Sequence, residues 1–362
     1  MWNNLGPPPA PAEMEVTVMG PGYGESIVVH LGQGEWLLVD SCVDATDNIQ
    51  RAAPLKYLKA RGVQVNLAVK LVAVSHWDDD HVCGIAEVVE ACSSAMFCCS
   101  TELTQREFLK FVESISDGAT ATDGGNVGQF RRVIRLLGSR NQTILGAKPG
   151  RQLFKYPVVK SWSPSDHDAM QFLNYVAQMH PHAGEQMRRA IPGSPNETSV
   201  VLSIDWEDAS VLLGADMEAV SDDHRGWGAV VLEANRIGFV RGGVVKVPHH
   251  GSETAHDPRM WSDLLLHQPI SVIAPFGRGP IASRPPKSSD VRRINGLSSA
   301  AFLTAKHSET KLPVMDFAVK RSLREGNIRL SSQRSTLGIV RLRRVFGLPW
   351  RHEMFGAAVR AK

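Results

Sequence analysis

The 362-residue sequence contains no run of 18 consecutive apolar residues, so it offers no candidate for a membrane-spanning helix. Its N-terminus has neither a basic start nor an apolar core, which argues against a secretory signal. The five cysteines lack CxxC spacing and lie mostly in apolar stretches, which indicates buried free thiols in a reducing compartment. The glycine-rich segment 20–24 lacks the lysine of a phosphate-binding loop and is interpreted as a turn. We therefore expect a cytoplasmic protein that binds no nucleotide through such a loop.

Composition favours a globular chain with one large core or two moderate ones, since 43% of the residues are hydrophobic and 21% are charged. The first 13 residues are rich in proline and predict a disordered leader. Residues 311–362 contain 12 Lys/Arg and 3 Asp/Glu, although the whole chain has a net charge of only +3. This segment is expected to be a basic C-terminal extension packed on the main domain.

Apolar runs and alternation predict strands in both halves of the chain, with helices between them. The expected strands are 15–18, 26–30, 36–39, 70–75, 95–99, 199–204, 210–214 and 243–247. The expected helices are 49–60, 84–91, 102–116, 126–138 and 168–180. The helix-rich stretch at about 102–190 is predicted to be an insertion that shapes a substrate cleft.

One short stretch concentrates metal-binding residue types. His76, Asp78, Asp80 and His81 fall within six residues, directly after the apolar run 71–74. Carboxylates so close together repel one another strongly unless a cation lies among them. Two divalent ions here would use one His/Asp pair each and polarise a water between them. The motif therefore predicts a two-metal site on a strand-to-helix loop.

The motif His-x-Asp-x-Asp-His followed by Gly84 resembles the variant metal motif of the metallo-β-lactamase fold, in the form found in the hydrolase domain of the competence protein ComEC and its soluble relatives. Four further segments resemble that subfamily in the same order along the chain. They are the strand ending at Asp40, the turn and strand 196–202, the strand ending at Asp216, and Lys-Val-Pro-His-His-Gly-Ser at 246–252. The resemblance covers residues 14 to about 305.

The resemblance implies an α/β fold, an αββα sandwich, with a catalytic domain at 14–310. It also implies that Asp216 bridges two ions, that His76 and Asp78 hold the first, and that Asp80 and His81 hold the second. One of His249 and His250 would complete the second site, and its neighbour would contact a phosphate or protonate a leaving group. The expected catalytic residues are Asp80, His249 and His250, and Asp40 and Asn196 are expected to support the ligands.

The aspartate-rich set suits zinc or manganese, and Asp78 in place of a histidine makes the first site harder and more anionic. The chain also departs from the common family pattern, because Pro195-Asn196-Glu197 stands where a further histidine is usual. His180 and His182 are alternative ligands, although a surface loop is the default interpretation of that segment. Arg284 lies in a segment that loosely resembles a ComEC-like loop and could contact phosphate.

A hard two-metal centre suits phosphodiester hydrolysis, and the resemblance points to a nuclease, with nucleic acid as its substrate. The basic C-terminal residues Arg341, Arg343 and Arg344 are predicted to follow a phosphate backbone, or else to form a partner-docking face. Rival functions are a small ester, lactone or cyclic-nucleotide hydrolase, and a metal-containing sensor or docking subunit. The relatives also suggest a role in bacterial antiphage defence with a partner NTPase or sensor protein, and a homo-oligomer remains open.

Overall fold

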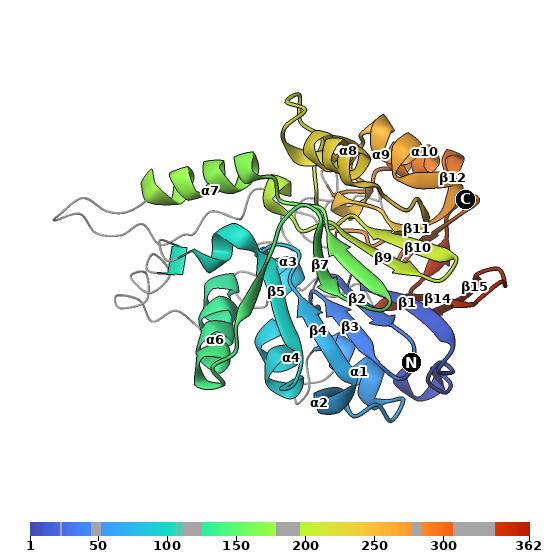
Figure 1. The fold of residues 1–362 in the computed structure, drawn as a ribbon. Coiled ribbons are helices and arrows are strands. Elements are labelled where there is room, and N and C mark those ends of the chain that lie inside the picture. The colour runs from blue at the N-terminus through green and yellow to red at the C-terminus, as the bar shows by residue number, and fades with distance from the viewer. Residues whose placement is uncertain are drawn as a thin grey trace, which may run out of the picture.

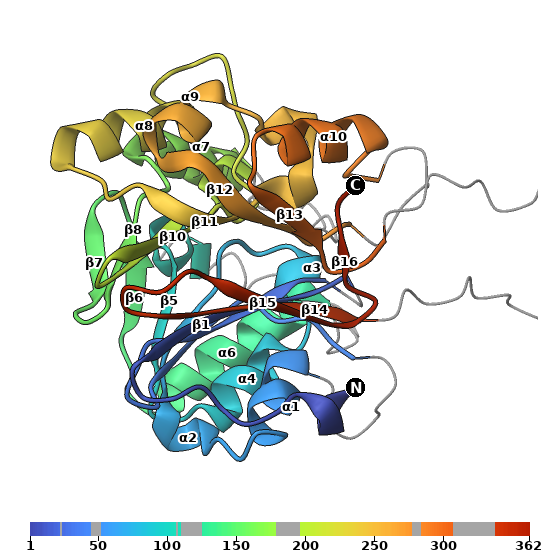
Figure 2. The same ribbon diagram turned by 90° about the vertical axis from the view of Figure 1, so that its right-hand side faces the viewer.

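The computed structural model describes residues 1–21, 24–44, 52–105, 108–109, 125–178, 196–276, 284–306 and 337–362. Two eight-stranded mixed sheets pack face to face, and helices cover both outer faces (Figures 1 and 2). The first sheet has the strand order β15-β14-β1-β2-β3-β4-β5-β6, and the second has the order β16-β13-β12-β11-β10-β9-β8-β7.

The strands of the first sheet come mainly from the first half of the chain. They are β1 Glu13–Gly20, β2 Ser26–His30, β3 Trp36–Val39, β4 Val69–Ala73, β5 Met96–Ser100, β6 Ile144–Ala147, β14 Gly338–Val345 and β15 Arg351–Gly356. The second sheet is built from β7 Arg151–Phe154, β8 Val158–Ser161, β9 Leu202–Trp206, β10 Ala209–Leu213, β11 Gly242–Lys246, β12 Leu265–Ile273, β13 Ala300–Leu303 and β16 Val359–Arg360.

The α-helices lie on the outer faces of the two sheets and around their ends (Figure 2). They are α1 Ala53–Lys59, α2 Val65–Ala68, α3 Asp79–Val82, α4 Ile85–Ala91, α6 Asn126–Ser139, α7 Asp166–Gln178, α8 Gly226–Ile237, α9 Pro258–Asp263 and α10 Ser288–Gly296. Short 3-10 turns complete the described elements: η1 Trp2–Asn4, η2 Thr101–Thr104, η3 Asn196–Thr198, η4 His249–Gly251 and η5 Glu253–Ala255.

Alternate residues of the central strands point to opposite faces of their sheet, one toward the other sheet and one toward the helices. The two sheets and the two helical layers therefore form a four-layered sandwich. In β3, Leu37 and Val39 face the core between the sheets, whereas Leu38 packs toward α1 and α4. In β10 and β11, Leu212 and Val245 pack toward α8 and α9 in a third core. Strands buried on both faces read as continuous apolar runs, so the sequence pattern located them well. No helix in the described ranges is long and apolar enough to cross a membrane.

The N-terminal residues differ from the predicted disordered leader. Leu5 is only 1% exposed, and its carbonyl accepts a hydrogen bond from Arg341 Nη1 at 2.7 Å. The carbonyl of Pro7 accepts hydrogen bonds from Arg61 Nη2 at 2.7 Å and from Arg343 Nη2 at 3.0 Å. A proline-rich segment is expected to be disordered when nothing binds its backbone. Here Arg61, which follows α1, and Arg341 and Arg343 of β14 donate hydrogen bonds to its carbonyl groups.

Two other predicted boundaries differ from the observed elements. Strand β14 pairs with β1 along its whole length, and β16 pairs with β13, so the described part of the C-terminal segment belongs to both sheets and is not an added extension. The segment 102–190 contains β6, β7 and β8, which extend both sheets, so only part of it is a helical insertion. Residues 106–107, 110–124, 179–195 and 307–336 of these segments lie outside the described residues.

Candidate metal centre

Four strands of the sandwich end at one rim, and the predicted site residues follow those ends. Asp40 follows β3, the loop with His76 follows β4, Asp216 follows β10, and His250 follows β11. Strands β3 and β4 are parallel, and so are β10 and β11, so each pair presents its carboxyl ends together. The rim thus brings residues from both sheets to one place, as is usual for ligand sites in such folds.

The backbone at this rim adopts conformations that side chains seldom permit. Positive φ angles occur at Asp40 (58°), Ala215 (47°), His249 (43°) and His250 (53°). Left-handed non-glycine residues cost of order 1–3 kcal/mol each and cluster at functional sites. The approach of Gly24 to the metal loop is also close, because a Cβ there would lie 1.9 Å from the Asp80 carbonyl oxygen. This geometry aims the side chains inward at a cost in stability.

The first group of facing atoms lies around His76. Its Nε2 lies 3.8 Å from Asp78 Oδ2 and 4.0 Å from Asp216 Oδ2. His76 is buried, whereas the Asp78 side chain is 33% exposed, so this end of the site is open to solvent. These three side chains could hold one cation and leave room for a further ligand.

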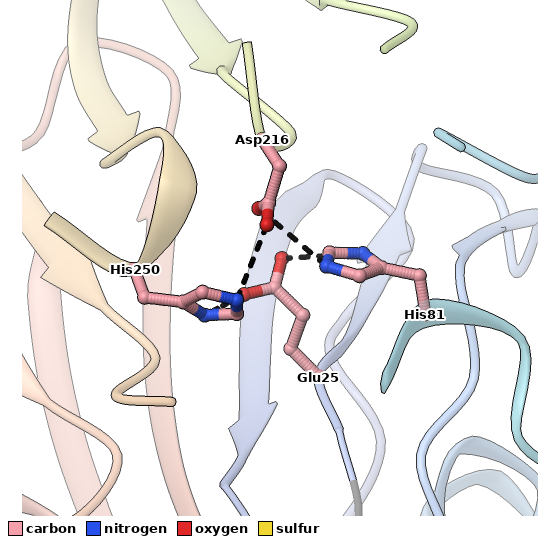
Figure 3. A group of neighbouring side chains, drawn as sticks. All are labelled: Glu25, His81, Asp216 and His250. Carbon is pink, nitrogen blue, oxygen red and sulfur yellow. Dashed lines mark ion pairs between the residues drawn. The ribbon is translucent and has the colours of Figure 1, made fainter. Parts of the chain in front are cut away.

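The second group shares Asp216 with the first. His81 Nε2 lies 3.5 Å from Asp216 Oδ1 and 3.7 Å from Asp80 Oδ2. His250 Nε2 lies 3.2 Å from Asp216 Oδ2 and 3.1 Å from Asp80 Oδ2. Figure 3 shows His81 and His250 converging on Asp216 from opposite sides. The carboxylate of Asp216 therefore faces histidines of both groups, as a shared ligand must.

All three histidines present the same ring nitrogen to the site, because their Nδ1 atoms are held from behind. Nδ1 of His81 lies 2.8 Å from Asp40 Oδ2, and Nδ1 of His250 lies 2.8 Å from the Ala274 carbonyl oxygen. Nδ1 of His76 lies 3.2 Å from Ser75 Oγ, whose hydroxyl donates to Asp40 at 2.6 Å. Such partners fix the tautomer that leaves Nε2 free for a metal.

Several buried polar atoms at the rim have no hydrogen-bond partner among the described residues. They are His76 Nε2, His81 Nε2, Asp78 Oδ1 and Asp216 Oδ1. Buried polar atoms are nearly always paired, so a cluster of unpaired ones requires an explanation. All four are nitrogen and oxygen ligands of the kinds that zinc and manganese accept. The residues present therefore fit divalent cations.

The electrostatics of the centre are dominated by its carboxylates. Burial lowers the pKa of His76 to about 4, so this imidazole is neutral at physiological pH. Burial also disfavours protonation of His81 and His250, but the nearby carboxylates, Asp216 foremost, outweigh it and raise both pKa values. For Asp216 burial would raise the pKa, yet His250 and His81 hold it well below its usual range. Because of these carboxylates, the site binds positive charge, either as protons on His81 and His250 or as metal cations.

The two adjacent histidines of the His-His-Gly-Ser segment have different surroundings. His250 is 3% exposed and faces the carboxylates, whereas Nδ1 of His249 lies 2.7 Å from Glu218 Oε1. Hydrogen bonds from His249, Thr254 and Asn196 hold the pKa of Glu218 below its ordinary value. The structure thus makes His250 the candidate ligand and leaves His249 beside it, a choice that the sequence could not make. Asn196 supports the His249 side of the site through Glu218.

Sequence reasoning missed two buried residues at this centre, Glu25 and Lys246. Glu25 Oε2 lies 3.4 Å from His250 Nδ1, and Oε1 lies 3.9 Å from His81 Nδ1. Glu25, His81, Asp216 and His250 form a compact group whose potential ligand atoms lie within 4.8 Å of one another (Figure 3). However, Glu25 approaches the Nδ1 side of both rings, so we interpret it as a support and not a ligand. In the sequence, Glu25 is marked only by its position between the glycine-rich turn 20–24 and the apolar strand 26–30.

The arginines predicted to form a phosphate track pair with carboxylates of the chain; Arg341 is buried, whereas Arg343 and Arg344 are partly exposed. Arg341 is 2% exposed and pairs with Glu353 at 2.9 Å. Arg343 pairs with Glu15 at 2.7 Å, and Arg344 pairs with Asp208 at 2.5 Å. A high local charge in the sequence did not reveal these partners, two of which lie more than 100 residues away along the chain. Arg284 is partly buried next to the undescribed segment 277–283, and His180 and His182 lie outside the described residues.

Residues 19–105 match the sequence profile of the metallo-beta-lactamase superfamily. Similar solved structures include the hydrolase AbOPH of the beta-lactamase superfamily, at 16% identity over 53% of this chain and 55% of that chain, with a TM-score of 0.33. The metallo-beta-lactamase fold protein YhfI from Bacillus subtilis is 12% identical over 82% of this chain and 97% of that chain, with a TM-score of 0.41. MEM-A1, a subclass B3 metallo-beta-lactamase isolated from a soil metagenome library, is 14% identical over 73% of this chain and 88% of that chain, with a TM-score of 0.36.

This chain spans about half the length of AbOPH. None of the curated protein sequences is significantly similar to it. The profile match covers strands β2 to β5 and the motif with His76 and His81. Together with the two packed sheets, it shows that the chain has the metallo-β-lactamase fold, with a candidate metal site at the strand ends.

Proposed function

We propose that this protein is a metal-dependent phosphodiesterase that uses two divalent cations, zinc or manganese. The observation that supports this is the convergence of His76, Asp78, Asp80, His81, Asp216 and His250 on one buried rim, with unpaired ligand atoms on four of them. Bound there, the cations would supply an activated water and neutralise charge on the scissile group.

Other roles in the proposed reaction fall to side chains that orient the ligands or face the substrate. Asp216 holds the two halves of the site together, since its oxygens face His76, His81 and His250. Asp40 and Ser75 keep the imidazoles in the ligating tautomer. His249, partly exposed and held through Nδ1 by Glu218, is placed to contact the scissile group or its leaving oxygen.

The composition of the ligand set favours phosphate esters over lactams and lactones. Three aspartates lie among the six ligating side chains, so the site is harder and more anionic than a histidine-rich zinc site. A hard two-metal pair is suited to binding the oxygens of a phosphodiester during in-line displacement. A cyclic nucleotide or other small phosphodiester would meet the same requirement.

The nuclease proposal rests on the ComEC-like motifs, including the Lys-Val-Pro-His-His-Gly-Ser segment at 246–252. The same resemblance supports, as a proposal, action on nucleic acid together with a partner NTPase or sensor protein in antiphage defence. Because Arg341, Arg343 and Arg344 are paired internally, the proposal gains no support from them.

The test compares substrates on protein prepared with manganese, with zinc and with chelator. The substrates are linear, circular and single-stranded DNA, RNA, a cyclic nucleotide, a chromogenic phosphodiester, a β-lactam and a lactone. We expect metal-dependent cleavage of the chromogenic phosphodiester and of at least one nucleic acid. Hydrolysis of only the lactam or lactone by the metal-loaded protein would overturn the proposal. An Asp80→Asn variant serves as the control for contaminating nuclease.

A further inference from the structure

A buried ion pair joins the two sheets directly behind the candidate metal centre. Lys246 ends β11 of the second sheet, and Glu25 immediately precedes β2 of the first. Both side chains are at most 2% exposed, and Lys246 Nζ lies 2.5 Å from Glu25 Oε1. Nothing in the metal-binding role assigned above requires a lysine at this place.

The ammonium of Lys246 has two further neighbours in the turn that carries the shared aspartate, one a hydrogen-bond acceptor and the other a nearby carboxylate. Nζ donates to the Ala215 carbonyl oxygen at 2.9 Å and lies 3.6 Å from Asp216 Oδ1. Ala215 has a positive φ of 47°, a conformation that must be held by its surroundings. Lys246 is one of the groups that hold it.

The charges around the centre give the lysine a second effect. Five carboxylates gather here: Asp78, Asp80 and Asp216 face the site, and Asp40 and Glu25 lie behind the histidines. Among the described residues Lys246 is the one ammonium in contact with these carboxylates, so four negative charges remain, the number that two divalent cations would neutralise. Glu25 holds the ammonium in place, and its own charge needs that ammonium because it is buried.

We propose that Lys246 is a positioning residue for the metal centre: anchored by Glu25, it fixes the Ala215 turn and thereby orients Asp216 toward both metal positions. This inference rests on the proposed two-metal centre but not on the identity of the substrate. Since Asp216 is shared, loss of Lys246 weakens binding at both positions together. Loss of a ligand that serves one position, such as His76, weakens mainly that position.

The experiment measures manganese and zinc binding by calorimetry, together with thermal unfolding in chelator. In Lys246→Met we expect the affinity at both positions to fall by about 10–100-fold, the usual effect of losing a group that orients ligands. This variant also leaves the buried Glu25 without its closest counter-ion, so it could fail to fold. The double variant Glu25→Gln/Lys246→Met removes both charges and keeps the net charge of the centre. It should fold, and its affinity should remain reduced because the Ala215 turn has lost its donor.

A matched control is Lys56→Met, which removes another buried lysine that pairs with Asp44 at 3.1 Å. It should lower the unfolding temperature and leave the metal affinity unchanged. Wild-type affinity at both positions in the double variant would overturn the inference, and so would a parent protein that binds no metal. A parent that binds two metals but cleaves no phosphodiester would contradict the proposed function alone, while the lysine variants would still decide the inference.

Discussion

Asp40 holds His81 from behind: its Oδ2 lies 2.8 Å from Nδ1 of the imidazole, and both side chains are fully buried. The same carboxylate accepts hydrogen bonds from the backbone N–H and the hydroxyl of Ser75, at 2.7 and 2.6 Å. Asp40 therefore links the end of β3 to the loop after β4. This linkage sets the direction of His81 Nε2 before any ligand binds.

Asp40→Asn should weaken metal binding because the amide cannot accept all of these hydrogen bonds and hold the imidazole. We expect a loss of affinity of about 10–100-fold, as for other groups that orient ligands. Competition with a fluorescent chelator would measure it. Asp205→Asn, at a half-buried carboxylate that accepts a hydrogen bond from Ser210 on β10, is the control that should bind metal normally. Equal affinities in the two variants would contradict the role given to Asp40.

Replacing the two neighbouring histidines should give different results. His250→Ala should lose about one metal per chain, because its Nε2 faces Asp80 and Asp216. His249→Ala should keep both metals but turn over roughly 100-fold more slowly, within the range lost with a proton-transfer group. Elemental analysis and turnover of a chromogenic phosphodiester separate the two. Retention of full metal content in His250→Ala would show that the ligand was misassigned.

Asp80→Asn should abolish turnover while leaving the fold intact, since Asp80 faces the two histidines of the second group. We expect a fall of more than about 100-fold, because even loss of an indirect metal partner costs 10–100-fold. Circular dichroism would report the fold, and the chromogenic assay the turnover. Near-wild-type turnover would argue against a two-metal mechanism, whereas an unfolded variant would mean that the metal is structural.

The metal-free protein should be most stable in mildly acidic solution. The raised pKa values of His81 and His250 stabilise the fold below about pH 6.5, and this contribution is lost as the pH rises through those values. The lowered pKa values of Asp80 and Asp216 stabilise it above about pH 4, and this contribution is lost as the pH falls.

Thermal unfolding in chelator should therefore give a higher midpoint near pH 6 than near pH 9. Added manganese or zinc should reduce this difference, because the cation replaces the protons on the two imidazoles. A metal-free midpoint that rises steadily from pH 6 to pH 9 would be inconsistent with protonated histidines at the centre. A His81→Asn/His250→Asn double variant should show a flatter profile over the same range.

Arg341 is predicted to stabilise the fold and not to bind nucleic acid. Arg341→Met should lower the free energy of unfolding by roughly 1–3 kcal/mol, because it leaves the Leu5 carbonyl without its donor. Arg351→Met is the exposed control, since an ion pair at a largely exposed arginine contributes only about 0–1 kcal/mol. Urea unfolding measures both. If Arg341→Met were as stable as the parent and showed a shallower salt dependence of DNA binding, the arginine would belong to a phosphate track after all.

The sequence by itself determined the sandwich and located most of the residues of the candidate metal site. Strands β3, β4, β10 and β11 are apolar on both faces, and such runs are local signals that a sequence displays directly. The cluster from His76 to His81 is equally local, because one strand-to-helix loop carries it. Asp216 and the histidine pair at 249–250 were located by their resemblance to family motifs, each at the end of a strand.

Only the tertiary structure decided which groups meet across the sandwich. Glu25 reaches His250 and Lys246 because the first sheet packs against the second, and no spacing in the sequence encodes that contact. Likewise, Arg343 meets Glu15, 328 residues away, only through the pairing of β14 with β1. The density of charge in a segment does not show such partners, and the arginines expected to form an exposed track pair with carboxylates of the chain. The choice between His249 and His250 depended on backbone angles at the end of β11, which the residue types alone do not specify.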